Sequence, residues 1–409
     1  MRKKKEILLF VCFVYCSIYS IAQTDTTAFS LPTKDRLSVH ERDFSDVLHS
    51  FSKKEKHKDT AANAAAKYYH TSLIPAVGYT LQTGFAGILS ANLAFANDNK
   101  PDTKLSSITT SLTYSQYSQT IVPVLADIWT KNNTYNFVSD NRFIAYPSDI
   151  YGLGGRTDPN KGLTINFTGL KLHETILRSV RKNLYAGVGF YFDKFWGIKA
   201  LDSLKRRDNT RFTRELGSSE TAVGVALKLL FDSRLNQINA TNGWYANVVY
   251  RPNFKFLGSD TRWQSLLVDV RKYVTFPKNS RNTLAFWNLY WLTTAGTPPY
   301  LLLPSTGWDD QYNTGRGYIQ GRFRGDNMYY FETEYRYCIT RNGLLGGVVF
   351  ANVQKFSGEI SKQFSSFTPS YGLGLRIKLN KYSGANLCID YGFGKDGSKG
   401  FFVNLGEVF

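Results

Sequence analysis

The chain lacks the features that mark several large protein classes. Only four cysteines occur in 409 residues, and two of them, Cys12 and Cys16, lie in an apolar run at the N-terminus. The other two, Cys338 and Cys388, can form one bridge at most, and cysteines on separate strands more often stay unpaired, so a disulfide scaffold is excluded. No later apolar run approaches the roughly 18 residues of a transmembrane helix, which excludes an ordinary helical membrane protein.

Signatures of enzymes and metal sites are also missing. The chain has no Gly-x-Ser-x-Gly elbow and no phosphate-binding glycine loop. Some barrel enzymes cleave lipids with a histidine and a serine, but His173 has no evident serine partner, and only a pair formed across strands stays open. We therefore expect no enzymatic activity, no cofactor and no metal. The histidines, which show no metal-ligand spacing, are His40, His49, His57, His70 and His173.

Residues 1–22 have the pattern of a secretory signal peptide. Four basic residues at 2–5 precede the apolar run 7–21, and Ala22 supplies the small residue at which we expect cleavage. Removing this segment lowers the formal net charge from +18 to +15. A basic chain can bind nucleic acid, but export and the absence of a clustered basic, aromatic-interleaved motif argue against a nucleic-acid partner.

From residue 73 onward, apolar residues recur at every second position. Aromatic residues make up 15% of the chain while the mean hydropathy is only −0.28. This combination is typical of a membrane β-barrel, in which apolar residues occupy alternate positions and aromatic girdles border the lipid. The pattern predicts an all-β fold, a 16-stranded antiparallel transmembrane β-barrel over residues 73–409. The predicted strands are 73–81, 84–97, 104–116, 119–131, 133–146, 161–176, 182–198, 218–232, 242–256, 261–275, 281–295, 326–340, 342–355, 368–380, 383–393 and 399–408.

The lengths of the connections agree with this count. Bacterial barrels have short periplasmic turns and long outer loops, with both termini on the periplasmic side. Counted from a periplasmic N-terminus, the long connections 147–160, 199–217, 296–325 and 356–367 all lie outside, and the tight turns 181–183, 278–280, 341–343 and 381–383 all lie inside.

Residues 23–72 are polar and predict a short periplasmic leader. Phe44, Val47, Leu48 and Phe51 recur at helical spacing, so we expect one amphipathic helix there. Two interpretations stay open. The helix is either solvated and followed by a flexible tether, or it plugs the barrel mouth or docks on a periplasmic partner.

The last predicted strand carries a C-terminal signal. Phe401, Val403, Leu405 and Phe409 alternate and are expected to share one apolar face toward the lipid. Glu407 interrupts that face near the periplasmic rim. Because no backbone group can stay unpaired in lipid, this strand is expected to close the barrel against the first strand.

A glycine-rich basic loop precedes a strand with one ionic face. In that strand Glu332 and Glu334 alternate with Phe331 and Tyr335, so one face is charged and the other apolar. Such a strand suits a wall between lipid and water. The loop residues of interest are Gly315, Arg316, Gly317, Tyr318 and Gly321.

This loop resembles a known signature. Arg316-Gly317-Tyr318, between the eleventh and twelfth predicted strands, resembles the Arg-Gly-Tyr/Phe motif of the Omp85 superfamily, which includes the outer-membrane insertases BamA and TamA and the bacterial surface antigen D15 domain. Tyr151-Gly152-Leu153-Gly154 is similar to the family's fifth-strand exit, and Phe409 to its aromatic end. A further match is the predicted periplasmic turn of Asp232, Arg234 and Asn236, closed by Gly243.

The resemblance implies a role for the loop arginine. In Omp85 barrels the sixth outer loop folds back into the lumen, and its arginine pairs with an acid on the barrel wall. Arg316 corresponds to that arginine here, and Glu332 and Glu334 are its candidate wall partners. Asn352 departs from the family, which often has an aspartate at this position. The alternative is that Arg316 only packs the loop.

The resemblance also implies a function. Insertases of the family carry periplasmic POTRA domains, for which the 23–72 leader is too short, so the chain resembles a form lacking them. Their first-to-last strand seam is weak; Pro75 and Gly78 favour a labile seam here, although an ordinary edge strand fits them equally well.

We therefore expect an outer-membrane protein of a diderm bacterium that contacts outer-membrane lipids. The expected role is membrane biogenesis, meaning protein insertion or translocation with a separate periplasmic partner. The alternative is a structural barrel or loop-plugged pore that serves as the membrane subunit of a larger envelope complex, bound to another outer-membrane protein.

Overall fold

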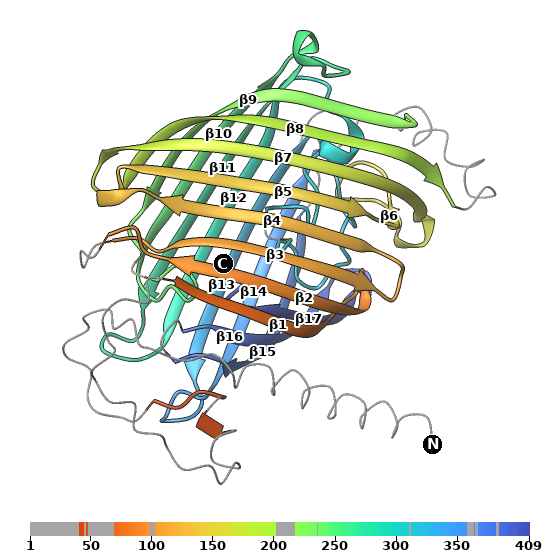
Figure 1. The fold of residues 1–409 in the computed structure, drawn as a ribbon. Coiled ribbons are helices and arrows are strands. Elements are labelled where there is room, and N and C mark those ends of the chain that lie inside the picture. The colour runs from red at the N-terminus through yellow and green to blue at the C-terminus, as the bar shows by residue number, and fades with distance from the viewer. Residues whose placement is uncertain are drawn as a thin grey trace.

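The chain folds into a barrel of antiparallel strands in its computed structural model (Figure 1). The structure describes residues 41–44, 46–47, 69–98, 103–201, 217–234, 236–310, 312–357, 364, 367–381 and 384–409. The predicted signal peptide, and Leu48 and Phe51 of the predicted leader helix, lie outside these residues. No helix in the described part of the chain is long and apolar enough to span a bilayer.

In the described part of the chain, sixteen long strands and one short strand form a single sheet. Each long strand pairs antiparallel with its neighbours in sequence, as β12 does with β13 and β15 with β16. The strands are β1 Tyr69–Thr80, β2 Gly84–Phe95, β3 Ser106–Ser115, β4 Thr120–Trp129, β5 Tyr135–Ala145, β6 Ser148–Ile150, β7 Leu163–Arg181, β8 Leu184–Ala200, β9 Ser219–Asp232, β10 Gly243–Asn253, β11 Trp263–Thr275, β12 Thr283–Gly296, β13 Asn327–Cys338, β14 Leu345–Phe356, β15 Thr368–Lys378, β16 Asn386–Gly394 and β17 Lys399–Leu405. Short 3-10 turns are η2 Lys131–Asn133, η3 Pro159–Lys161, η4 Lys255–Leu257 and η5 Tyr300–Leu302.

The predicted fold class and strand count are confirmed. The sixteen predicted segments coincide with the sixteen long strands, with differences of a few residues at their ends. β1 begins at Tyr69, before the predicted start at residue 73, and β17 ends at Leu405, before the predicted end at 408. The predicted loop 147–160 is not entirely irregular, because it contains β6, which pairs with β7.

The two faces of the sheet differ in polarity. Outward-facing side chains such as Leu89, Leu112 and Leu373 are apolar and exposed, which suits a surface covered by lipid. The inward face carries buried ion pairs, for example Arg271 with Asp269 at 2.6 Å. The alternation follows from the strand period of two, and it makes the interior polar.

β1 and β17 meet at a seam that differs from the other strand pairs. β1 pairs with β2 and β17 with β16, but no backbone ladder joins β1 to β17 in the described part of the chain, so the barrel is nearly closed. The two strands nevertheless lie side by side, and a Cβ on Gly400 of β17 would come within 2.2 Å of the Cδ2 atom of Leu81, the residue that follows β1. β17 has 7 residues and β1 has 12, so the seam is also uneven.

Candidate functional site: the lumen loop and its acidic wall

The connection between β12 and β13, called the lumen loop (residues 297–326), folds back into the barrel. Thr306, Arg316 and Arg324 are at most 2% exposed. Arg324 donates hydrogen bonds to the carbonyl oxygens of Tyr300 at 2.9 Å and Leu303 at 3.4 Å. A side chain of the loop therefore stabilises the loop's own backbone. A loop of this length that is held in one conformation is a structured part of the lumen rather than a flexible connection.

The outer loop after β6 packs onto the lumen loop. The Gly154 amide donates to the Arg324 carbonyl at 2.6 Å, and Arg322 lies 4.9 Å from the Tyr151 ring. Gly152 and Gly154 have φ of 93° and 100°, which side chains rarely tolerate. The Tyr151–Gly154 segment therefore contacts the loop that carries the Arg-Gly-Tyr motif.

Glycine lets the lumen loop approach the barrel wall closely. Gly317 has φ of 107°, and a Cβ on it would lie 2.9 Å from the Ser370 Cβ. A Cβ on Gly392 of β16 would lie 2.7 Å from the Gly317 nitrogen. Glycine is thus needed on both the loop and the wall, because any side chain would push them apart.

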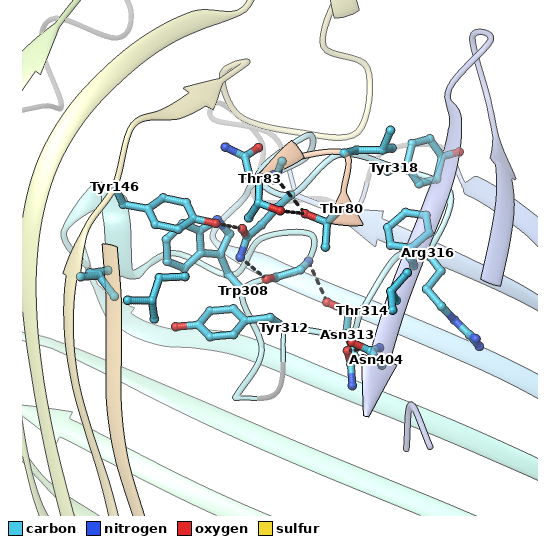
Figure 2. A pocket seen from close by; sticks show the side chains of 18 residues that line it. Thr80, Thr83, Tyr146, Trp308, Tyr312, Asn313, Thr314, Arg316, Tyr318 and Asn404 are labelled. Atoms are coloured by element: carbon cyan, nitrogen blue, oxygen red, sulfur yellow. Dashed lines mark hydrogen bonds between the residues drawn. The ribbon is translucent and has the colours of Figure 1, made fainter. Parts of the chain in front are cut away.

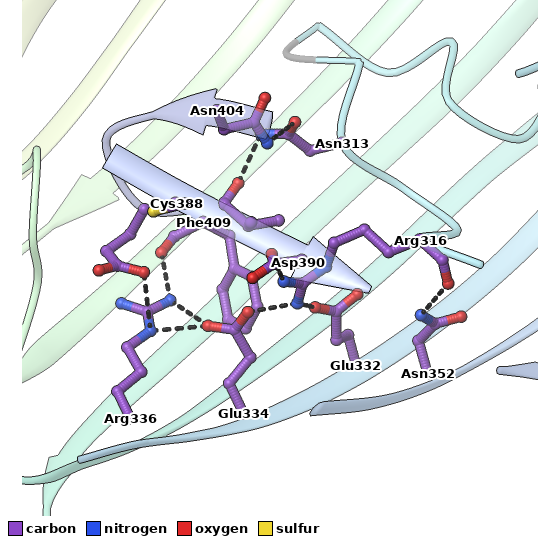
Figure 3. A network of polar contacts seen from close by, with 12 residues as sticks. Asn313, Arg316, Glu332, Glu334, Arg336, Asn352, Cys388, Asp390, Asn404 and Phe409 are labelled. Carbon is purple, nitrogen blue, oxygen red and sulfur yellow. Dashed lines mark hydrogen bonds and ion pairs between the residues drawn. The ribbon is translucent and has the colours of Figure 1, made fainter. Parts of the chain in front are cut away.

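Arg316 ends in a pocket of three carboxylates (Figure 3). Its Nη1 lies 2.5 Å from Asp390 Oδ2, and its Nη2 contacts Glu332 and Glu334. The guanidinium also lies 3.8 Å from the centre of the Phe350 ring. We call Arg316, Glu332, Glu334 and Asp390 the Arg316 cluster.

The electrostatics of the cluster keep Arg316 charged. Burial disfavours the cation, but Glu332, Glu334 and Asp390 outweigh this effect and raise the pKa of Arg316 well above its ordinary value. Because a buried ion pair is costly to break once formed, the loop is held strongly while all partners are present.

The backbone of Arg316 is held by different residues. Its carbonyl accepts hydrogen bonds from Asn352 Nδ2 at 3.2 Å and Ser370 Oγ at 2.5 Å. Asn352, which replaces the expected acid, therefore binds the loop backbone, while Asp390 supplies a further negative charge. The Tyr318 hydroxyl donates to the Pro369 carbonyl at 2.5 Å.

The sequence analysis did not identify Asp390 as a partner of Arg316, nor Arg336 and Arg376 as further cations beside the cluster. Arg336 donates to Glu334 at 2.6 Å, and Arg376 donates to Asp390 at 2.5 Å, so these carboxylates are each shared by two arginines. A usable signal was present, because Asp390 is the acid that alternates with apolar residues in the predicted strand 383–393.

The prediction that Phe409 shares a lipid face with Phe401, Val403 and Leu405 is wrong. Phe401 and Leu405 are 49% and 57% exposed on the outer face, but Phe409 is 5% exposed. The strand ends at Leu405, and Gly406 with φ of 86° redirects the chain inward. Residues 406–409, the C-terminal tail, therefore enter the lumen.

Aromatic and charged groups inside the lumen explain this course. Phe409 packs against Trp287 with ring centroids 5.2 Å apart, and its carbonyl accepts from Arg336 Nη2 at 2.8 Å. Glu407 is paired with Arg376 Nε at 2.9 Å and accepts from Asn386 at 2.6 Å. The prediction that Glu407 lies on the lipid face is wrong for the same reason.

Comparisons with known proteins show which solved structures have a similar architecture. No protein-family model and no curated protein matches the chain. Among solved structures, BamA from Haemophilus ducreyi lacking POTRA domains 1–3 aligns with a TM-score of 0.52 and 13% identity, over 82% of this chain and 68% of that chain. CdiB from Acinetobacter baumannii aligns with a TM-score of 0.56 and 13% identity, over 84% of this chain and 60% of that chain.

The chain has the Omp85 barrel fold. The fold that the resemblance implied is thus confirmed, because the chain aligns with the solved barrels of BamA and CdiB. At 13% identity the likeness is one of fold, and the chain spans 60% of the length of CdiB.

The turn between β9 and β10 of this Omp85-type barrel carries the Asp-x-Arg-x-Asn motif. Arg234 Nη2 lies 2.9 Å from Asp232 Oδ2, and Asn236 Oδ1 accepts from the Ile238 amide at 2.8 Å. Gly243 has φ of 106°, and a Cβ there would lie 2.9 Å from the Ser233 carbonyl oxygen. The motif residues therefore close one compact turn.

The described leader residues rest against three turns at the end of the Omp85-type barrel predicted to face the periplasm. Glu41 pairs with Arg281 at 2.8 Å, and the Arg42 amide donates to the Asn342 carbonyl at 3.0 Å. Asp46 pairs with Lys381 at 2.9 Å. Phe44, Asp46 and Val47 have helical backbone.

His173 is part of the lumen wall. Its Nε2 lies 3.0 Å from Asp193, and its ring stacks on Tyr191 with centroids 3.8 Å apart. Arg251 donates to the same Asp193 at 2.6 Å. Across the described residues, no group of histidine, cysteine, aspartate and glutamate side chains is arranged to hold a metal ion, and Cys338 and Cys388 are free thiols.

Proposed function

We propose that the chain is an outer-membrane protein of a diderm bacterium that acts in membrane biogenesis, inserting or translocating protein at the β1–β17 seam. A separate periplasmic partner delivers the client. The observation that carries this proposal is the seam, where β1 and β17 lie side by side without a backbone ladder among the described residues.

The free-energy cost of unpaired backbone groups at the edges of β1 and β17 supports the proposal. Backbone N–H and C=O groups that face lipid without a partner each cost several kcal/mol. A client strand that adds to the edge of β17 or β1 satisfies these groups by β-augmentation. Pro75 has no backbone N–H, so β1 has one donor fewer with which to pair.

The likeness to BamA and CdiB gives further support, because both solved barrels belong to the fold to which the Omp85 motif also points. The lumen loop suits the same role, since the ion pairs of Arg316 tie it to β13 and β16. Outer-membrane lipids are the surrounding solvent for the apolar outer face.

A disulfide across the seam tests the proposal. Leu81→Cys with Gly400→Cys is suited to this, because the leucine side chain that a Cβ on residue 400 would meet is removed. Exposed Cys338 is first replaced by serine to prevent wrong pairing. The expected result is loss of client assembly and of growth under oxidising conditions, with recovery in reductant.

Ile389→Cys with Val403→Cys is the matched control, because these residues are paired partners in the β16–β17 ladder. That disulfide locks two strands that are already bonded and is expected to be harmless. If the seam disulfide forms fully and client assembly continues, the gated-seam function is refuted.

A structural barrel or plugged pore is the second candidate. The lumen loop and the C-terminal tail both occupy the lumen, with Arg316 and Phe409 buried, and this favours a closed barrel. In that case the protein serves as the membrane subunit of a larger complex. Normal growth with the seam locked, together with co-purification of a stable partner, is the result expected for this candidate.

A further inference from the structure

The outer face of β5 and β7 carries a small polar patch. It consists of Glu174 from β7 and of Ser139 and Asn141 from β5, and we call it the Glu174 patch. We propose that this patch is the docking site of a second outer-membrane protein, whose membrane-embedded segment places an arginine or lysine side chain against Glu174. The proposal does not rest on the seam function, because the patch lies on other strands.

Strand alternation sets the orientation of Glu174. On β7 it alternates in step with Leu172 and Ile176, which are 37% and 39% exposed on the outer face. The residues between them face the other way, since His173 belongs to the lumen wall and Thr175 is buried. Glu174 therefore points outward, and it is exposed.

Ser139 and Asn141 face outward in the same way. They alternate in step with Phe137 and Phe143, which are 43% and 41% exposed. In the β5–β7 ladder Ser139 lies opposite Glu174. The Asn141 amide donates to Glu174 Oε1 at 2.7 Å, and the Ser139 hydroxyl donates to Glu174 Oε2. The three side chains thus form one polar surface.

The Glu174 patch lies within the apolar band of the barrel. Glu174 is seven residues before Arg181, where β7 ends at the turn predicted to face the periplasm. At roughly 3.3 Å per residue this is about 23 Å along the strand. A tilt of about 40° converts it to a height of roughly 18 Å, within an apolar band about 25 Å tall. Exposed apolar side chains surround the patch and are Phe137, Phe143, Leu172, Ile176, Val188 and Phe190.

Glu174 differs in orientation from the other acids of the long strands. Of the acids on these strands, as far as the structure describes them, Glu174 alone belongs to the outer face. The acids that face the lumen are Asp127, Asp140, Asp193, Glu220, Asp232, Asp269, Glu332, Glu334 and Asp390. An ionisable side chain at this depth is costly in lipid and marks a functional contact.

The hydrogen bonds within the patch do not balance the charge of Glu174. Ser139 and Asn141 are neutral donors, and they fill two of the roughly four acceptor positions of a carboxylate. Among the described residues Glu174 forms no ion pair. Lipid tails offer neither a donor nor a charge at this depth. The group that completes the site is therefore a cation supplied from outside the barrel.

The chemistry of a carboxylate favours arginine or lysine in that role. A guanidinium can donate to both carboxylate oxygens at once, and a lysine ammonium to one of them. A second copy of this chain in the same membrane presents its outward cations at other heights. Arg178 is four residues nearer to the periplasmic end of β7, and Lys194 pairs with Leu170, four residues toward the outer end. The partner is therefore a different protein.

The inner side of the barrel at the lumen loop has no room for such a segment. The cavity between the β1–β2 turn (residues 81–83), the lumen loop and β17 has a volume of about 150 Å³ (Figure 2). One turn of an α-helix, about 10 Å wide and about 5.4 Å long, fills about 400 Å³. A partner segment cannot bind in this cavity, whereas the outer face that carries Glu174 is accessible.

Photo-crosslinking in living cells tests the proposal. The full chain carries the photoreactive residue p-benzoylphenylalanine in place of Phe190, which lies opposite Glu174 in the β7–β8 ladder and is 49% exposed. Illumination is expected to give an adduct with a different outer-membrane protein. Mass spectrometry is expected to place the cross-link in a membrane-embedded segment that contains an arginine or a lysine.

Two variants test the role of the charge. Glu174→Gln keeps the side-chain volume and removes the charge, so the adduct yield is expected to fall about tenfold. Glu174→Arg places like charges together and is expected to abolish the adduct. Replacing the cation of the partner protein by glutamate is expected to restore it. Heat-dependent migration in SDS gels checks that each variant still forms a folded barrel.

Two controls separate the patch from the rest of the surface. Asp396→Asn removes an exposed acid from the β16–β17 turn and is expected to leave the adduct yield unchanged. p-Benzoylphenylalanine in place of Leu373, which is 61% exposed on the outer face of β15, is expected to give no adduct with the same protein.

Absence of an adduct from a folded barrel, or an adduct with lipid only, would overturn the proposal. An adduct between two copies of this chain would also overturn it, because the partner would then not be a different protein. A wild-type yield from Glu174→Gln, or a cross-linked segment without a basic residue, would show that no cation binds Glu174 and would reject the proposal.

Discussion

The side-chain amide of Asn313 donates a 2.8 Å hydrogen bond to the carbonyl of Val408. This bond joins the lumen loop to the C-terminal tail. Asn404 of β17 donates to the same Asn313 side chain at 3.0 Å, so the loop also holds the seam strand itself. The Arg316 cluster, the tail and β17 therefore form one connected structure, and loosening one part is expected to affect the others.

Replacing Arg316 by alanine is expected to release the lumen loop while the barrel stays folded. Removal of one partner from a buried ion pair costs about 3–5 kcal/mol, because Glu332 loses its contact with Arg316 while Glu334 and Asp390 keep only Arg336 and Arg376. Protease cleavage within residues 297–326 and ion leak through the barrel in planar bilayers should both rise. Exposed Arg262→Ala is the control, and wild-type values for Arg316→Ala would contradict the prediction.

Neutralising the wall should reproduce this effect from the other side. The double variant Glu332→Gln with Glu334→Gln keeps side-chain volume but removes two of the charges that hold Arg316. We expect the same rise in loop cleavage, and an additional rise with Asp390→Asn. If one single variant reproduces the whole effect, that residue is the main partner.

Phe409→Ala should free the C-terminal tail. Deleting a buried phenylalanine costs about 3–5 kcal/mol, and the contact with Trp287 is lost. Hydrogen exchange is expected to be faster at residues 406–409 and along β17. Phe401→Ala, at an outward-facing position of the same strand, serves as the comparison. Equal protection of the tail in both variants would refute a role for Phe409 in holding it.

Acid should release the tail through Glu407. Burial raises the pKa of Glu407, but Arg376 and Arg336 outweigh burial and lower it below the ordinary 4.5. A group with a lowered folded-state pKa stabilises the fold fully above its unfolded pKa, and this contribution is lost as the pH falls through the folded value. Tail protection, measured by hydrogen exchange, should decline as pH falls below 4.5, whereas Glu407→Gln should lack this component.

Charge reversal at Lys381 should detach the leader. Lys381 binds Asp46 through its ammonium and Asp43 through its backbone amide, so Lys381→Glu places like charges together. Cleavage by added protease near residues 41–47 is expected to increase. The swap of Lys381→Glu with Asp46→Lys should restore protection, because it recreates the pair with opposite polarity. Failure of the swap to restore it would mean that the leader is held by other contacts.

The sequence by itself determined the strands and their faces. Alternation is a local property, so residues such as Leu373 and Leu375 reveal a lipid-facing strand without knowledge of their neighbours. Turn lengths agreed with the strand count, and the Arg316-Gly317-Tyr318 motif pointed to a lumen loop with Glu332 and Glu334 as candidate partners. In the structure both acids contact Arg316.

Only the tertiary structure decided what closes the lumen. Asp390 is far from Arg316 in sequence and meets it because β13 and β16 curve around the same loop. Phe409 continued the outward pattern of β17, yet it turns inward because Trp287 and Arg336 offer it an aromatic and a cationic partner. Periodicity specifies a face only while the strand lasts. Where the strand ends, the free energy of contacts distant in sequence decides where the chain goes.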